Sequence, residues 1–62
     1  SAEQIEQEIS AAEAELRELT EKLANPAADW GPDQYLEIDR RQAELTANLE
    51  ALYREWETAS AG

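Results

Sequence analysis

The sequence predicts an all-α fold, a two-helix antiparallel coiled-coil hairpin, and two observations indicate it. Apolar residues recur at alternating spacings of three and four over two long segments, which is the heptad pattern of coiled-coil helices. Both prolines and one of the two glycines lie together between these segments. Two amphipathic helices joined by a short loop fold back antiparallel. We therefore expect the 62 residues to form a single hairpin domain over 1–62.

The first helix is expected over residues 2–24. Ser1, with Gln4 three residues later, is typical of a capping box at a helix start. Asn25 followed by Pro26 favours a helix end, because Asn tolerates the left-handed C-terminal conformation and Pro disfavours helix in the residue before it. Its apolar seam consists of Ala2, Ile5, Ile9, Ala12, Leu16, Leu19 and Leu23.

We expect a loop over residues 25–32 and a second helix over residues 33–60. Gly31 is suited to be the N-cap, with Pro32 following where its missing N–H costs nothing. Asp33 then lies at the positive end of the helix dipole. The second seam consists of Tyr35, Ile38, Gln42, Leu45, Leu49, Leu52, Trp56 and Ala59.

The two seams also predict how the helices pair. Ala2 and Tyr35 are heptad position a of their helices, and Ile5 and Ile38, three residues later, are position d. Antiparallel packing places a opposite d, and pairs whose residue numbers sum to 61, such as Ile9 with Leu52, use both seams in full. Trp56 then fills the core opposite Ile5. Gln42 has two interpretations, a local or solvent-facing amide or a buried polar residue that specifies register.

Charge and composition exclude several classes of function. Fifteen acidic residues against five basic ones give a net charge of −10, which disfavours broad attraction to phosphate backbones. The chain has no Cys and no His, so we expect no enzyme activity, no metal site and no cofactor. No apolar run approaches the roughly 20 residues of a membrane span, and we expect a cytoplasmic protein without membrane contact.

Most charges are interpreted as a solvated helical face with four i,i+4 ion pairs. These pairs are Glu13/Arg17, Glu18/Lys22, Glu37/Arg41 and Glu50/Arg54.

Four residues near the loop are candidates for contact with nucleic acid or another partner. Lys22, Arg40 and Arg41 fall near the loop end of the hairpin, together with Trp30. Cations beside an aromatic ring are the combination that single-stranded nucleic-acid sites use. Neighbouring acids offer the alternative of a neutralised surface. Trp30 likewise is either a lid over Tyr35 at the end of the seam or an exposed contact residue.

Three features resemble a known family: Lys-Leu-Ala-Asn-Pro at 22–26, the aromatic Tyr35 beyond the turn, and Leu-Tyr-Arg-Glu-Trp-Glu at 52–57. The chain resembles the C-terminal coiled-coil domain of the ABC-F proteins, the twin-ATPase family that includes the Uup branch. The resemblance implies a fragment of a larger ATP-binding protein and a non-catalytic accessory role in ribosome or DNA association. It implies structural roles for three residues: Pro26 sets the turn, Tyr35 follows it, and Trp56 locks the open end.

Two other interpretations stay open at this point. The hairpin is suited to be a structural interaction arm of an unrelated larger protein. It is also suited to self-association, in which two hairpins bury Leu36 and Tyr53 in a four-helix bundle.

Overall fold

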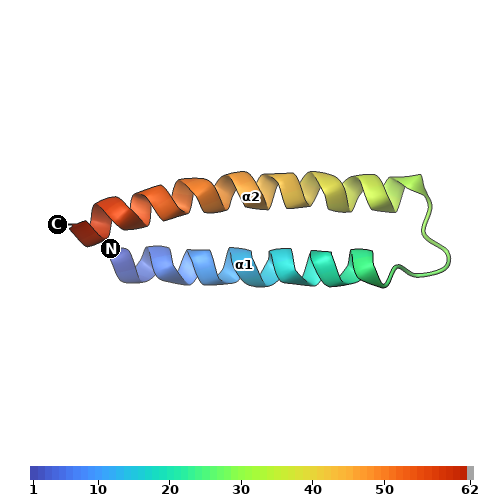
Figure 1. Cartoon of the computed structure of the whole chain (residues 1–62), viewed down its shortest axis with the longest axis horizontal. Coiled ribbons are helices and arrows are strands. Elements are labelled where there is room, and N and C mark those ends of the chain that lie inside the picture. The colour runs from blue at the N-terminus through green and yellow to red at the C-terminus, as the bar shows by residue number, and fades with distance from the viewer. Residues whose placement is uncertain (62) are drawn as a thin grey trace.

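The computed structural model describes residues 1–61 as a rod of two antiparallel α-helices (Figure 1). Helix α1 spans Ala2–Ala24 and helix α2 spans Pro32–Ala61. The rod measures 50 × 14 × 13 Å, and the start of α1 and the end of α2 lie together at the end opposite the loop. The prediction of an all-α helical hairpin is confirmed. The first helix coincides with the predicted span, and the second extends the predicted span by one residue at each end.

The ends of α1 are closed by short-range hydrogen bonds. Ser1 is the N-cap, and its Oγ accepts a hydrogen bond from the Gln4 N–H at 3.3 Å. At the other end, the Asn25 N–H donates to the carbonyl oxygens of Glu21 and Lys22 at 3.1 and 3.2 Å. Asn25 has φ −141° and ψ 60°, so the expectation of a left-handed residue there is wrong. The shared N–H closes the last turn without it, and Pro26 follows at once.

The start of α2 is fixed by a reciprocal pair of bonds between Gly31 and Gln34. The Gly31 N–H donates to Gln34 Oε1 at 2.8 Å, and the Gln34 N–H donates to the Gly31 carbonyl oxygen at 3.2 Å. Pro32 lies between them as the first residue of the helix, where it has no N–H to leave unpaired. The loop therefore enters α2 at a defined angle.

The core lies in the central layers of the rod. Four seam residues are buried: Ala12, Leu45, Leu49 and Leu52. Ala12, Leu45 and Leu49 form one cluster, and the half-buried residues packed against it are Ile9, Leu16 and Leu19. Every one of these belongs to the predicted seams, because only the a and d faces of two antiparallel helices meet. Gln42 is half-buried.

The cross-helix hydrogen bonds agree with the predicted register. Arg41 of α2 pairs with Glu15 of α1, and Tyr53 of α2 donates to Glu13 of α1. The residue numbers of the two pairs sum to 56 and 66, which is symmetrical about 61. Glu15 and Arg41 occupy g positions, and Glu13 and Tyr53 occupy e positions. Antiparallel helices bring like-lettered flanking positions together, so both pairs are what the register requires.

The predicted ion pairs within each helix do not form. Within residues 1–61 the ion pairs all involve Arg41, which contacts Glu15 across the hairpin and Glu44 at i,i+3. Exposed i,i+4 pairs gain little, because ordering two long side chains offsets most of the attraction. Arg41 instead finds a carboxylate on the facing helix that it can bind with two parallel N–H groups.

Candidate functional site

The tip of the hairpin, meaning the loop 25–31 and the adjoining helix turns, holds an aromatic pair. The ring centroids of Trp30 and Tyr35 are 5.2 Å apart and the ring planes meet at 78°, an edge-to-face contact. The backbone N–H of Trp30 donates to the Ala27 carbonyl oxygen at 3.1 Å, which turns the loop back toward α2. Trp30 is half-buried, and Tyr35 keeps 43% of its surface exposed. The contact agrees with Trp30 as a lid beside Tyr35.

A hollow of about 460 Å³ opens beside Trp30. The side chains of Lys22 from α1 and of Gln34, Glu37 and Ile38 from α2 line it together with the indole. Trp30 therefore contacts Tyr35 and also borders a solvent-open hollow. Apolar groups and one charge of each sign meet in this hollow, which suits stacking or hydrogen bonding with a bound group.

The structure brings together two of the four tip residues singled out by the sequence. Lys22 and Trp30 line the same hollow. Arg40 is exposed and lies outside that lining. Arg41 also lies outside that lining, and its guanidinium is paired with Glu15 of α1. Two N–H bonds to the Glu15 carboxylate of the facing helix hold the Arg41 guanidinium there.

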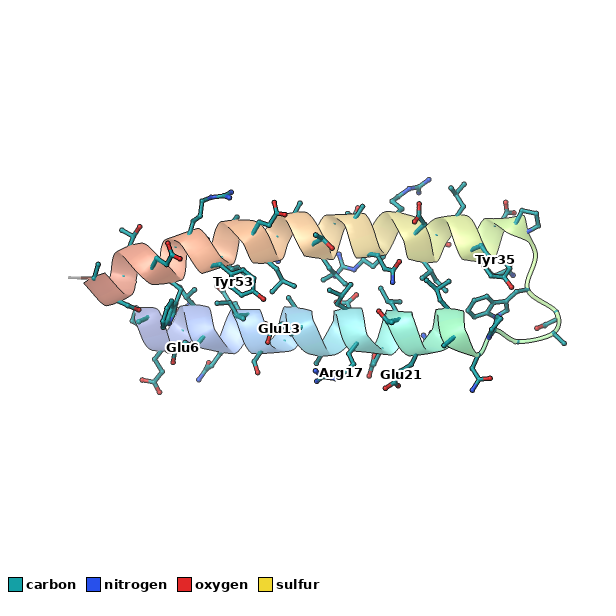
Figure 2. The ribbon with its side chains drawn as sticks, viewed as in Figure 1. Glu6, Glu13, Arg17, Glu21, Tyr35 and Tyr53 are labelled. Carbon is teal, nitrogen blue, oxygen red and sulfur yellow. The ribbon has the colours of Figure 1, made fainter. Side chains whose placement is uncertain are left out.

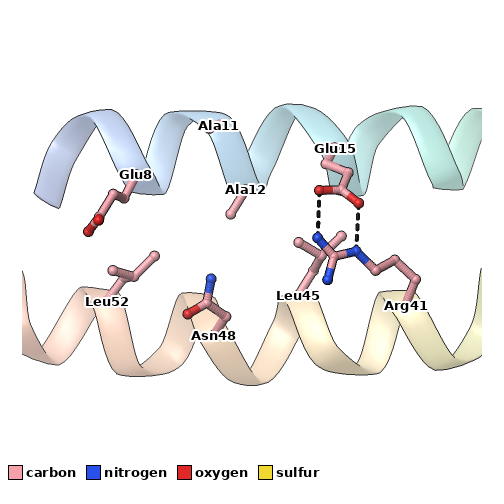
Figure 3. Close-up of a pocket in the computed structure, with 8 residues that line it drawn as sticks. All are labelled: Glu8, Ala11, Ala12, Glu15, Arg41, Leu45, Asn48 and Leu52. Atoms are coloured by element: carbon pink, nitrogen blue, oxygen red, sulfur yellow. Dashed lines mark hydrogen bonds and ion pairs between the residues drawn. The ribbon is translucent and has the colours of Figure 1, made fainter.

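Arg41 and Glu15 form a two-pronged ion pair (Figure 3). The Arg41 Nε donates to Glu15 Oε2 at 2.6 Å, and its Nη2 donates to Glu15 Oε1 at 2.9 Å. The hydrogen bond from Arg41 lowers the pKa of the Glu15 carboxyl from its ordinary value of 4.5. Hydrogen bonds to Glu15 and then Glu44 raise the pKa of the Arg41 guanidinium. Both groups stay about half exposed, so water screens the attraction.

Near the open end, where α1 begins and α2 ends, two aromatic residues cross to α1. The Tyr53 hydroxyl donates to Glu13 Oε2 at 2.6 Å, and this bond raises the pKa of the Tyr53 phenol above its ordinary 10.0. Figure 2 labels the two side chains. The Trp56 Nε1–H donates to Glu6 Oε2 at 2.8 Å. Trp56 keeps 37% of its surface exposed, so its interpretation as a core residue is wrong. An indole N–H requires an acceptor, and the ring leans outward to reach one.

Sequence reasoning missed the three cross-helix contacts of Glu15, Glu13 and Glu6. A signal for them was present, because each acid occupies an e or g position beside the seam. Such positions meet flanking residues of the facing helix rather than neighbours in the same helix. Glu13 was predicted to pair with Arg17 of its own helix, whereas it accepts a hydrogen bond from Tyr53 of α2.

Within the part of the chain that the structure describes, no group of three or more acidic, His or Cys side chains is arranged to hold a metal ion. Neither α1 nor α2 is long and apolar enough to cross a membrane.

The fold and its projecting tip define a small helical-hairpin module, built to hold a loop away from its two ends. The chain belongs to the ABC transporter C-terminal domain family, whose model matches residues 1–61. This membership confirms the suspected C-terminal domain and replaces the alternative of an arm from an unrelated protein. No solved structure matches the chain.

Proposed function

We propose that the chain is a non-catalytic C-terminal accessory domain of an ABC-F type ATP-binding protein, acting in the cytoplasm in ribosome or DNA association. The observation that carries the proposal is the rod itself. The start of α1 and the end of α2 lie together at the open end of the rod, and the tip lies up to 50 Å from them (Figure 1). A domain attached at the open end can therefore present the tip to a partner at a distance from the ATPase body.

The tip residues that make this contact are Lys22, Trp30 and Arg40. Lys22 and the indole already border one hollow, and Arg40 is exposed on the next turns of α2. A base can stack on an exposed indole face while a neighbouring ammonium group binds phosphate. Arg41 contributes to the contact only after it releases Glu15.

Charge limits how strongly such a tip holds nucleic acid. Lys22 and Arg40 can neutralise about two phosphates, so the log-log dependence of the association constant on salt has a slope of magnitude below about 2. The remaining acidic surface repels phosphate, given a net charge of −10. Stacking on Trp30 favours single strands, and a tip of this kind adds to the binding of a larger protein rather than acting alone.

Three residues support the tip and the shaft in this proposal. Pro26 sets the turn after α1, and Tyr35 holds the Trp30 ring through their edge-to-face contact. Trp56 fixes the open end through its bond to Glu6. None of the three needs to touch the partner.

The test is a titration of Trp30 fluorescence in a Trp56→Phe background with single-stranded DNA, duplex DNA and ribosomes at low salt. We expect emission to shift with single strands or ribosomes, and Lys22→Gln to weaken the response. Arg17→Gln is the matched control, because it removes one exposed cation from α1 away from the tip. If emission stays constant at high micromolar oligonucleotide and at micromolar ribosome, the tip contact is wrong.

A further inference from the structure

The hollow beside Trp30 contains one group that phosphate binding does not explain, the carboxylate of Glu37. Lys22 of α1 and Glu37 of α2 both line the hollow, and both side chains are exposed. Within residues 1–61 no ion pair joins them. A carboxylate close to an ammonium group weakens the attraction of that group for phosphate. Glu37 therefore indicates a second kind of contact with whatever enters the hollow.

The cations near Glu37 leave its carboxylate free to accept hydrogen bonds. Arg40 and Arg41 follow Glu37 at i+3 and i+4 on α2, the spacings at which helix ion pairs form. Arg41 is bound to Glu15 and Glu44 instead. Arg40 lies outside the lining of the hollow, and within residues 1–61 it forms no ion pair. Over the same residues, no side-chain hydrogen bond involves Glu37.

The indole of Trp30 has a face to offer to a planar ligand. Its ring plane meets that of Tyr35 at 78°, and an edge-to-face contact covers at most one face of either ring. The indole also borders the hollow, where Ile38 supplies an apolar wall. A nucleobase that stacks on the indole therefore enters the same hollow as Glu37.

Gln34 adds a hydrogen-bond donor to the hollow. Its Oε1 accepts a bond from the Gly31 N–H at 2.8 Å, which fixes the orientation of the amide. The amide nitrogen remains as a donor, because an amide side chain has an acceptor oxygen and a separate NH₂ group. Gln34 and Glu37 are three residues apart on α2, so they are neighbours on its surface. The hollow therefore presents a donor beside a carboxylate acceptor.

Guanine is the nucleobase whose edge matches this pair of groups. Its Watson–Crick edge has an acceptor, O6, followed by two adjacent donors, N1–H and N2–H₂. A carboxylate accepts from two adjacent donors at once through parallel bonds, as it does from an Arg side chain. Adenine and cytosine each offer one amino group beside an acceptor nitrogen, and uracil or thymine offers one N–H between two carbonyl oxygens. Each of these three arrangements places an acceptor against the carboxylate.

We propose that the hollow binds a guanine base of single-stranded nucleic acid, with the base stacked on Trp30, its N1–H and N2–H₂ donating to Glu37 and its O6 accepting from Gln34. Lys22 binds an adjacent phosphate. This preference rests on the tip contact proposed above and adds to it the reading of one base. A single strand is required, because only an unpaired base exposes its Watson–Crick edge.

The test compares short single strands that differ in one central base. Guanine, adenine, cytosine or hypoxanthine is placed within a run of thymines in DNA and within a run of uracils in RNA, so the two sources are distinguished. The readout is the NMR signal of the Trp30 indole N–H. The indole N–H of Trp56, which donates to Glu6 near the open end, is the internal reference and should not shift.

The guanine strand should bind about fivefold or more tighter than the adenine strand, at the lower end of the range for a bidentate base contact. Adenine is the matched ligand, because it is also a purine and stacks comparably on the indole. Hypoxanthine keeps O6 and N1–H but lacks the N2 amino group, so it should lose most of the preference.

Glu37→Gln and its matched control, Glu21→Gln, separate base reading from charge. Each change removes one exposed carboxylate from the tip, but only Glu37 lines the hollow. Glu37→Gln should reduce the guanine preference to about twofold or less and should tighten binding of the all-thymine strand, since a charge that repels phosphate is gone. Glu21→Gln should tighten all strands alike and keep the preference. A merely structural role of Glu37 would instead weaken every strand together.

Four results would overturn the proposal. Equal affinities for all central bases would remove the guanine preference and leave the tip contact in place. A Trp30 signal that no strand moves at millimolar concentration would remove both. A preference that survives Glu37→Gln would assign the reading to another side chain. Guanosine monophosphate that binds as tightly as the guanine strand would identify the occupant as a free nucleotide.

Discussion

Leu45 is the residue whose truncation should cost the hairpin most. It is only 3% exposed and packs with Ala12 and Leu49 at the centre of the rod. Leu45→Ala removes groups worth about 2.4 kcal/mol of transfer free energy, at about 0.8 kcal/mol for each of three carbons. A cavity term adds to this, but the half-buried neighbours of so thin a rod can move inward. We expect a loss of about 3 kcal/mol in the free energy of unfolding, near the lower end of the Leu→Ala range.

This loss is large against the stability of the whole domain, which is about 3 to 9 kcal/mol for 62 residues. The assay is urea unfolding followed by far-UV circular dichroism. Leu36→Ala is the matched control, because the same truncation is made in the same helix at a residue that is 58% exposed. Its effect should stay within about 0.5 kcal/mol. Equal losses for the two variants would refute the placement of the core.

Further predictions concern acid, base and the first helix turn. The hydrogen bond from Arg41 lowers the pKa of the Glu15 carboxyl from 4.5. The stability that this ion pair contributes is therefore complete above pH 4.5 and is lost as the pH falls through the folded pKa. In thermal melts, the difference in melting temperature between the parent and Glu15→Gln should shrink on acidification. The hydrogen bond to Glu13 raises the pKa of the Tyr53 phenol above 10.0, so the stability that this bond contributes is complete below that pH and is lost as the pH rises through the folded pKa. In a Tyr35→Phe background, ultraviolet titration of Tyr53 should give a lower midpoint with Glu13→Gln than without it. Equal midpoints would contradict the bond. Ser1→Ala should lower the free energy of unfolding by about 0.5 to 2 kcal/mol and Ser1→Gly by less, as measured by urea midpoints; identical midpoints for all three proteins would show that the cap is not stabilising.

Hydrophobic spacing predicted the fold because it reports directly on burial. Leu45 and Leu49 are buried because they follow the three-and-four rhythm on α2, and Ala12 meets them for the same reason on α1. The helix bounds followed from Ser1 and Pro32, whose local chemistry favours those positions in any helix. Each of these features depends on neighbours in sequence or on one repeating face.

The positions of the polar side chains could not be obtained in this way, because they depend on competition between partners. Arg41 has an acid at i−4 in its own helix and another on the facing helix, and it binds the second through two N–H groups. Trp56 follows the seam rhythm but carries a polar N–H, and in the outer layer of the rod the ring reaches Glu6. Charge pairing and ring orientation are decided in three dimensions, by which groups lie within reach.

The concentration of burial in the central layers means that the hairpin should fray from both ends. Leu23 and Ile38 near the loop are only half-buried, and Ala59 at the other end is exposed. Amide exchange should therefore be slowest around Leu49 and should quicken in both directions, since local opening needs less free energy where fewer apolar groups separate. A ligand at the loop would therefore stiffen a segment that opens often. Binding at the loop should therefore carry an unfavourable entropy from ordering that segment.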